Sequence, residues 1–385
     1  MQKPRIPTIK EGANTYTDFL KAKEQSPVSE TFIKAILKNK IPDEAEIEVS
    51  LFQICGLKCA FCWQDHDDKT GLESIVGKIE PITEFVKSNP SKKFNVCLMG
   101  GEIFEEARED QHYEDYFTLI QGVNANAEPL GKKVKWILVT NLLFKDPTRV
   151  LAFTERLNEA GVEWCISSSL DFHGRPVKHS IETLWHKNVL RFKDHIGTIN
   201  MVLTGPTIRR FLDRNTDRSY FDYLYREGFP LSFDYYTPES NAELLVPSDE
   251  ELLNFFLEVA RNYPQMEPMK AWLENEFNQM SCMSLNKLTI LPNNRMVTCR
   301  QLEYGGNDFQ HQIHYESNAN IIQSFITKKE CLSCPYFGRC GFSCFVLDDH
   351  VYFSQRQKLS ECLYKIMFRE IEARRGLNHQ ADRNL

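Results

Sequence analysis

The sequence lacks long apolar segments. No window approaches the eighteen or so consecutive apolar residues that a membrane-spanning helix needs, and the N-terminal string MQKPRIPTIKEGANTY lacks the apolar core of a secretory signal. We therefore expect no membrane partner and a cytoplasmic location. The sequence also lacks internal repeats and low-complexity tracts, which excludes a repeat array.

Long basic runs are absent too. The net charge is −7, which disfavours nonspecific binding to a nucleic-acid backbone. Hydrophobic residues make up 42% of the chain and charged residues 26%, a balance that permits a large core and argues against global disorder. A length of 385 residues suits two or three domains, or one barrel with an extension.

Cysteine is plentiful, with twelve residues. In a reducing cytoplasm, cysteines indicate metal ligands or catalytic thiols rather than structural disulfides. The string IEVSLFQICGLKCAFCW holds Cys55, Cys59 and Cys62 in the spacing CxxxCxxC, directly after a short alternating apolar run. Three thiolates do not complete a tetrahedral zinc site, but they hold three irons of a cubane iron–sulfur cluster and leave the fourth iron open.

Strand-like and helix-like segments alternate after residue 45. The expected strands are Ile47–Gln53, Phe94–Met99, Val134–Asn141, Val162–Leu170, Thr198–Thr204 and Leu231–Tyr236. The expected helices include Leu72–Ser88, Tyr113–Gly122, Pro147–Ala160, Ile181–Phe192, Ser219–Glu227, Ser248–Tyr263 and Glu267–Met280. Their spacing is that of βαβ units, so we expect a parallel sheet curled as part of a barrel, with its active face at the C-terminal strand ends. We divide the chain into an N-terminal segment (1–45), a core barrel (46–240) and a helical and cysteine-rich region (241–385).

The three-cysteine loop and the expected barrel together resemble the radical S-adenosylmethionine (SAM) superfamily. The match is carried by Cys55, Cys59 and Cys62, with Phe61 before the last cysteine. The resemblance implies an α/β fold with a partial (β/α)6 TIM-like barrel. It also implies a 4Fe–4S cluster whose open iron is chelated by SAM, and reductive cleavage of SAM to a 5′-deoxyadenosyl radical.

Further residues at the expected strand ends resemble the family's SAM-binding positions. The run CLMGGEIF resembles its GGE segment, and Thr140–Asn141 resembles its TNG with Leu142 in place of the glycine. The resemblance assigns contacts with SAM or substrate to Phe61, Gly100, Gly101, Glu102, Ser169, Asp171 and Asn200. Ordinary roles stay open for three of the residues at these strand ends: Glu102 as a carboxylate at a helix start, and Thr140 and Ser167 as strand-end hydrogen bonders.

The run CLSCPYFGRCGFSC near the C-terminus resembles the SPASM extension of radical SAM enzymes, which carries auxiliary iron–sulfur clusters. Before it lies a hairpin-like run, KLTILPNNRMVTC, in which Asn294 stands at the family's glycine position. The resemblance implies two auxiliary clusters, one held by Cys331, Cys334, Cys340 and Cys362 and the other by Cys282, Cys299 and Cys344. A zinc ribbon remains an alternative, although seven cysteines fit two clusters better.

SPASM enzymes mostly modify ribosomally made peptides, so we expect oxidative modification or crosslinking of a peptide or protein. An electron donor such as flavodoxin or ferredoxin is implied. The residues before the first strand are too few for a complete leader-binding domain, so a separate leader-peptide-binding protein is a candidate partner. Arg300 follows Cys299, where sulfatase-maturing members carry an aspartate, and this disfavours sulfatase oxidation.

The catalytic base is unknown. Asp234, Tyr236, His173 and Arg175 are candidates by position alone. Two other functions remain open: a radical SAM oxidase or isomerase of a small metabolite such as a sugar or an amino acid, and a noncatalytic metal-stabilised binding protein.

Overall fold

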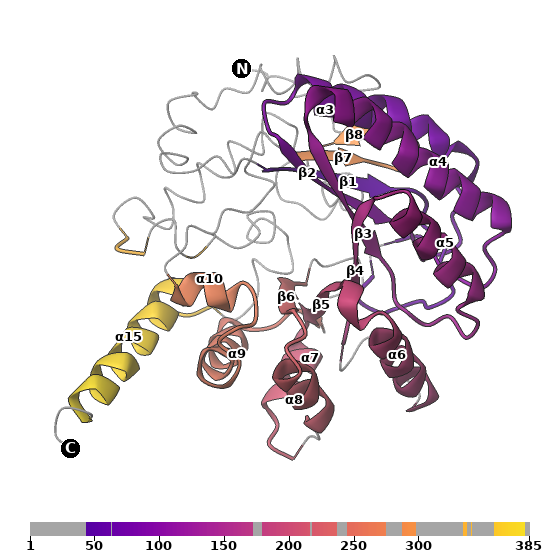
Figure 1. The fold of residues 1–385 in the computed structure, drawn as a ribbon. Coiled ribbons are helices and arrows are strands. Elements are labelled where there is room, and N and C mark those ends of the chain that lie inside the picture. Colours follow the sequence, from indigo (N-terminus) through magenta and orange to yellow (C-terminus); the bar gives the residue numbers. More distant parts are fainter. Residues whose placement is uncertain are drawn as a thin grey trace, which may run out of the picture.

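The structure is a computed structural model that describes residues 44–62, 64–171, 179–215, 218–236, 245–274, 287–297, 334–336, 340 and 358–381, with only the backbone at 179, 180 and 375–381. One eight-stranded sheet in the order β6-β5-β4-β3-β2-β1-β7-β8 forms its centre. All neighbouring strands pair in parallel except β7 and β8. The sheet is curled, and helices cover its outer face (Figure 1).

The elements alternate as the βαβ pattern requires. The strands are β1 (Glu44–Ser50), β2 (Lys93–Met99), β3 (Lys133–Val139), β4 (Glu163–Ser169), β5 (Ile196–Leu203), β6 (Leu231–Tyr235), β7 (Lys287–Ile290) and β8 (Met296–Val297). The α-helices are α3 (Ile79–Ser88), α4 (Asp110–Ala127), α5 (Thr148–Glu159), α6 (His179–Arg191), α7 (Gly205–Leu212), α8 (Ser219–Arg226), α9 (Asp249–Asn262), α10 (Met269–Leu273) and α15 (Leu363–Ala381).

The two faces of the sheet differ in burial and polarity. On the face under the helices, β2 to β4 bury Val96, Leu98, Trp136 and Ile166 completely. The opposite, concave face is half-buried and carries mostly polar side chains toward β4, β5 and β6. An alternating strand therefore builds the core with one side and lines the barrel interior with the other.

The expected α/β partial barrel is confirmed, and each of the six expected strands overlaps an observed one. Helix α7 was not expected. Its sequence is short, but the Thr204 side chain accepts a hydrogen bond from the Thr207 amide and a proline stands in its first turn. Both are helix-start signals. The expected helix over residues 72–88 is two short 3-10 turns followed by α3.

The hairpin of β7 and β8 is part of the barrel sheet, because β7 pairs with β1. Asn294 in its turn has φ 63°, the left-handed backbone for which a glycine or asparagine is suited. Lys78 attaches this turn to the body of the protein. Its fully buried Nζ donates to the Leu291 carbonyl at 3.1 Å, to the Pro292 carbonyl at 3.2 Å and to Asn294 Oδ1 at 2.8 Å.

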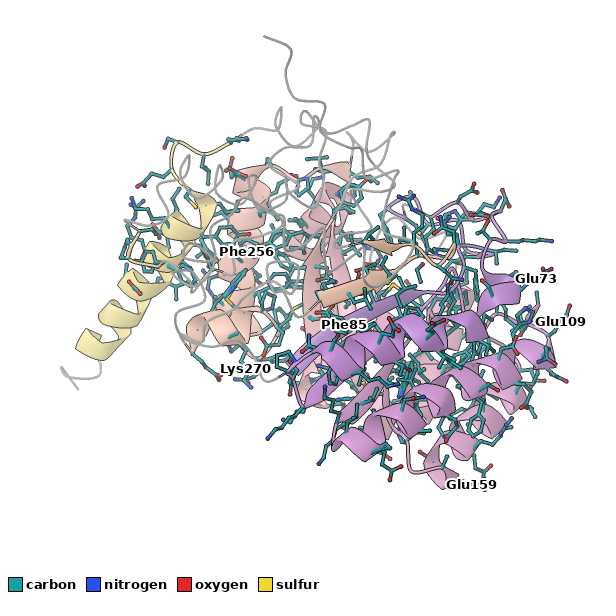
Figure 2. All side chains as sticks on the ribbon, turned by 90° about the horizontal axis from the view of Figure 1, so that it is seen from above. Glu73, Phe85, Glu109, Glu159, Phe256 and Lys270 are labelled. Carbon is teal, nitrogen blue, oxygen red and sulfur yellow. The ribbon has the colours of Figure 1, made fainter. Side chains whose placement is uncertain are left out.

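Helix α9 joins the C-terminal elements to the barrel. Ser248 and Glu251 form a reciprocal capping box at its start, and α15 packs against it. Phe256 of α9 lies inside the molecule, whereas Glu73, Glu109 and Glu159 lie at its outer edge (Figure 2). In the described ranges, no helix combines the length and the apolar character required to cross a bilayer.

Candidate functional site

The three cysteines lie on the loop that leaves the C-terminal end of β1. The Cys55 amide donates to the His66 carbonyl at 3.2 Å, and the Cys62 amide donates to the Cys59 carbonyl at 3.1 Å. All three thiols are half-buried, and none forms a disulfide. The fold therefore presents three reduced thiols from one loop at the strand ends, where α/β barrels carry their chemistry.

This loop reaches from β1 to the far side of the curled sheet. Phe61 packs in the apolar cluster around Tyr236, which directly follows β6, together with Val202 of β5. β1 and β6 are separated by four strands in the sheet order. The cysteine loop consequently spans the mouth of the partial barrel, between the first and the sixth strand.

Gly100 and Gly101 follow β2 and let the cysteine loop approach the sheet. A Cβ atom on Gly101 would lie 2.0 Å from the Ile54 carbonyl oxygen, and one on Gly100 would lie 2.8 Å from the Phe52 ring. Gln64 donates its amide to the Gly100 carbonyl at 2.7 Å. A side chain at either position would therefore collide with the cysteine loop, and this explains the two glycines without reference to a ligand.

Glu102 is buried, with 4% of its surface exposed. Its carboxylate accepts hydrogen bonds from Thr140 Oγ1 at 2.6 Å, from the Asn141 amide at 2.7 Å and from the Phe104 amide at 2.9 Å. Burial raises the pKa of this carboxyl group, and the three donors oppose the rise. Glu102 therefore links the ends of β2 and β3, and its contact with the SAM amino group stays a prediction.

Arg108 holds the start of the cysteine loop through hydrogen bonds. Its Nη2 donates to the Ile54 carbonyl at 3.3 Å and to Glu105 Oε2 at 2.9 Å, and its Nε donates to the Glu102 carbonyl at 3.2 Å. Glu105 Oε1 in turn accepts from the Gly56 amide at 2.7 Å, next to Cys55. We call this group of Arg108, Glu105 and Gly56 the loop clamp.

Sequence reasoning missed the loop clamp. The only signal was Glu105 three residues before Arg108, a spacing common on exposed helix faces. The structure shows instead that Arg108 is almost fully buried and that its guanidinium stacks over the Phe52 ring at 4.7 Å.

The turn after β3 has a left-handed residue at the position of the motif's glycine. Leu142 stands where the family motif has glycine, and its φ is 56°, in the left-handed region. Its amide donates to Thr140 Oγ1 at 3.2 Å, and its carbonyl accepts from Asn188 Nδ2 at 2.9 Å. Neighbouring residues therefore hold this costly conformation.

The remaining predicted SAM or substrate residues meet on the concave side of β4 to β6. Ser169 pairs with Asn200 in the strand register, and Asp171 Oδ1 accepts from the Val202 amide at 2.9 Å. Asn200 donates to the Asp234 carboxylate and accepts from Ser232 Oγ. Asp234, a candidate base, thus shares a polar patch with Asn200. His173 and Arg175 lie outside the described residues.

The donor set of the cysteine loop fits an iron–sulfur cluster in its chemistry, since three free thiols come from one loop at the barrel mouth. Burial above all, then the carboxylates of Glu102 and Glu105, raises the pKa of the Cys55 thiol to about 11, against a lowering hydrogen bond from the Leu57 amide. Metal binding therefore has to displace a proton there. Across the described ranges, no three side chains of His, Cys, Asp or Glu converge into a ready metal site.

Three of the predicted auxiliary ligands, Cys334, Cys340 and Cys362, are described and half-buried. Tyr336 stacks on Phe368 of α15 at 5.0 Å, so the segment around Cys334 lies along the helix that begins right after Cys362. The other four predicted ligands lie outside the described residues: Cys282, Cys299, Cys331 and Cys344.

Comparison with known proteins identifies the fold. A scan against protein-family models and a search of curated proteins both give no match. Among solved structures, the chain is similar to the native form of anSMEcpe with bound AdoMet, an anaerobic sulfatase-maturating enzyme of the radical SAM class. The sequence identity is 15% and the TM-score is 0.58, and the match covers 88% of this chain and 99% of that chain. A hexahistidine-tagged form of the same enzyme with bound AdoMet is similar at 14% identity and a TM-score of 0.57, over 87% and 98%. The chain therefore has the fold of the radical SAM enzymes.

Proposed function

We propose that this protein is a radical SAM enzyme that oxidatively modifies or crosslinks a peptide or protein. The observation that carries the proposal is the position of Cys55, Cys59 and Cys62 on one loop across the barrel mouth. The GGE and TNG-like turns lie at the ends of the neighbouring strands. The cofactor supplies a strong hydrogen-abstracting radical when SAM is cleaved by one electron, and the protein supplies binding and orientation.

The cysteines named above are the residues that would hold the cluster. Gly101, Ser169 and Asn200 are the proposed neighbours of SAM, and Phe61 covers the mouth on the side of β6. There it packs in the apolar cluster around Tyr236, which is itself buried. Asp234, hydrogen-bonded to Asn200, offers an acceptor to a substrate donor on the concave face.

The peptide substrate is proposed from the cysteine array of the C-terminal region, which resembles SPASM. Auxiliary clusters there would accept an electron from the oxidised substrate. An external donor such as flavodoxin or ferredoxin, and a separate leader-peptide-binding protein, complete the proposal.

A cleavage assay tests the radical chemistry. Protein purified without oxygen is reconstituted with iron and sulfide, then given dithionite and SAM, and 5′-deoxyadenosine is measured. We expect the parent and a Cys97→Ala control in strand β2 to release it and Cys59→Ala to release none. Equal cleavage by Cys59→Ala and the parent, or a parent that yields zinc and no 5′-deoxyadenosine, contradicts the proposal.

A second variant separates cleavage from substrate oxidation. We expect Cys331→Ala to keep part of the SAM cleavage and to lose the modified product, because its proposed auxiliary cluster serves substrate oxidation and not SAM cleavage. Mass spectrometry of a candidate peptide co-expressed with the enzyme reads the product. Turnover of a metabolite without any peptide assigns the small-molecule alternative and ends the maturase proposal.

A further inference from the structure

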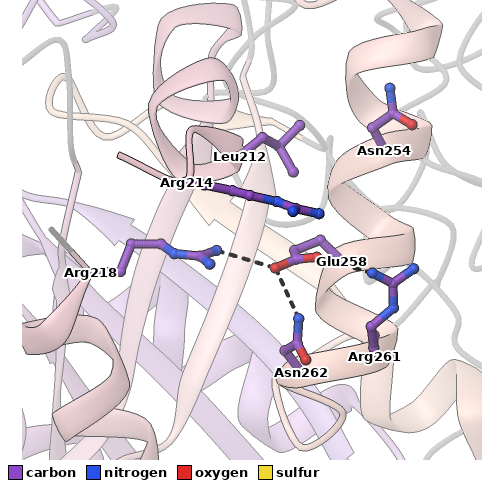
Figure 3. A pocket seen from close by; sticks show the side chains of 7 residues that line it. All are labelled: Leu212, Arg214, Arg218, Asn254, Glu258, Arg261 and Asn262. Atoms are coloured by element: carbon purple, nitrogen blue, oxygen red, sulfur yellow. Dashed lines mark hydrogen bonds and ion pairs between the residues drawn. The ribbon is translucent and has the colours of Figure 1, made fainter. Parts of the chain in front are cut away.

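We propose that a cleft on the outer side of the barrel binds the phosphate group of a small molecule. The cleft has a volume of about 510 Å³, a size common for small-molecule sites. It lies between α9 and the connection from α7 to α8 (Figure 3). Its lining residues are Leu212, Arg214, Arg218, Asn254, Glu258, Arg261 and Asn262.

The lining is polar and carries an excess of positive charge. Three arginines face one carboxylate, and Leu212 is the single apolar residue among the lining side chains. The whole protein has a net charge of −7, so this local excess opposes the overall balance. Guanidinium groups held close together repel one another, and an oxyanion between them removes that repulsion.

Arg218 is held in place without a ligand. Its Nη1 donates to the Phe211 carbonyl at 3.0 Å and to Glu258 Oε1 at 3.3 Å, and its guanidinium lies over the Phe211 ring at 5.2 Å. Its side chain is only 21% exposed. A guanidinium fixed in this way loses little conformational freedom when it binds an anion.

Glu258 organises the cleft and leaves Arg214 available. The Glu258 carboxylate accepts from Asn262 Nδ2 at 2.9 Å and pairs with Arg261 at 3.8 Å, in addition to Arg218. Arg214 extends toward this group (Figure 3), and within the described part of the chain no hydrogen bond or ion pair engages its guanidinium. Guanidinium groups match phosphate oxygens with two parallel hydrogen bonds.

This cleft is separate from the site of the proposed radical chemistry. Its residues belong to α7, α9 and the residues before α8, on the outer side of the sheet, whereas the cysteine loop and the polar patch of β4 to β6 lie at the barrel mouth and on the concave face. The inference therefore stands whether or not the protein cleaves SAM.

Isothermal titration at low chloride tests the inference, with inorganic phosphate and a sugar phosphomonoester as the probes. We expect the parent to bind phosphate, and Arg214→Gln combined with Arg261→Gln to weaken the binding by about tenfold or more. Arg226→Gln, an exposed arginine of α8 outside the cleft, is the matched control and should bind like the parent. The two substituted arginines lie at the surface, so we expect each variant to fold like the parent. Circular dichroism of each variant checks this.

The outcomes are distinct. Tighter binding of the phosphomonoester assigns the cleft to a phosphorylated small molecule, and equal binding assigns it to free phosphate. A parent that prefers neither probe to chloride overturns the inference. Equal affinities in the double variant, the control and the parent overturn it as well, because the anion then binds elsewhere.

Discussion

At the scale of single residues, Arg108 supports the cysteine loop through its hydrogen bonds. Arg108→Gln removes the charge that Glu105 and the Ile54 carbonyl use, and loss of a buried partner costs about 3 kcal/mol. We expect reconstituted Arg108→Gln to hold its iron about tenfold more weakly, as is typical when residues that support metal ligands change. Iron retained after a chelator challenge measures this.

The control for Arg108 is Arg156→Gln, which removes an exposed pair with Glu114 between α4 and α5. That variant should retain iron like the parent. Retention by Arg108→Gln equal to that of Arg156→Gln would show that the loop clamp does not hold the cysteines.

Single residues also show where sequence reasoning stops. The three-cysteine motif and the GGE segment could be predicted because the residues of each lie close together in the sequence. That Glu102 would accept three protein hydrogen bonds, and that Arg108 would be buried under Ile54, depended on contacts between β1, β2 and β3. Such contacts are set by tertiary packing, which a local pattern does not carry.

At the scale of elements, β7 is attached to β1 by charge as well as by backbone pairing. Lys287, 8% exposed, lies 3.0 Å from Glu48 and 3.3 Å from Glu46. Lys287→Met leaves two neighbouring carboxylates without their cation, and we expect a loss of about 3 kcal/mol in the free energy of unfolding by urea. Lys93→Met, which removes an exposed pair with Glu44 between β2 and β1, should cost less than about 1 kcal/mol. Equal losses would mean that Lys287 is effectively solvated.

Helices and strands could be predicted where the repeating pattern of apolar residues extends over enough positions. The six barrel strands and the helices α4, α5 and α9 follow from repeating apolar positions. Helix α8 was predicted although it has eight residues, whereas the equally short α7 was missed because it opens with Gly205 and a proline, a pair typical of turns. The hairpin was predicted from its turn, but its place beside β1 was not, because strand order depends on contacts far apart in sequence.

At the scale of the whole molecule, Lys78 connects segments 213 residues apart. Burial lowers its pKa to about 7, from an ordinary value of 10.5. Above pH 7 the Lys78 amine then holds fewer protons in the folded protein than in the unfolded chain, so its contribution to stability rises with pH up to about 10. Below pH 7 both states are protonated, and the burial penalty is complete.

A Lys78→Met variant isolates this contribution. We expect the stability of the parent relative to this variant to increase between about pH 7 and about pH 9.5, as measured by urea unfolding at several pH values. A constant difference over that range would show that the oxygens of Leu291, Pro292 and Asn294 keep the ammonium charged in the folded state.

The place of β1 in the sheet has a mechanical consequence. β1 pairs with β2 along one edge and with β7 along the other. Displacing the strand from which the cysteine loop leaves therefore requires both ladders to break. The first residues of the cysteine loop therefore start from an anchored strand and have little freedom to shift relative to the sheet.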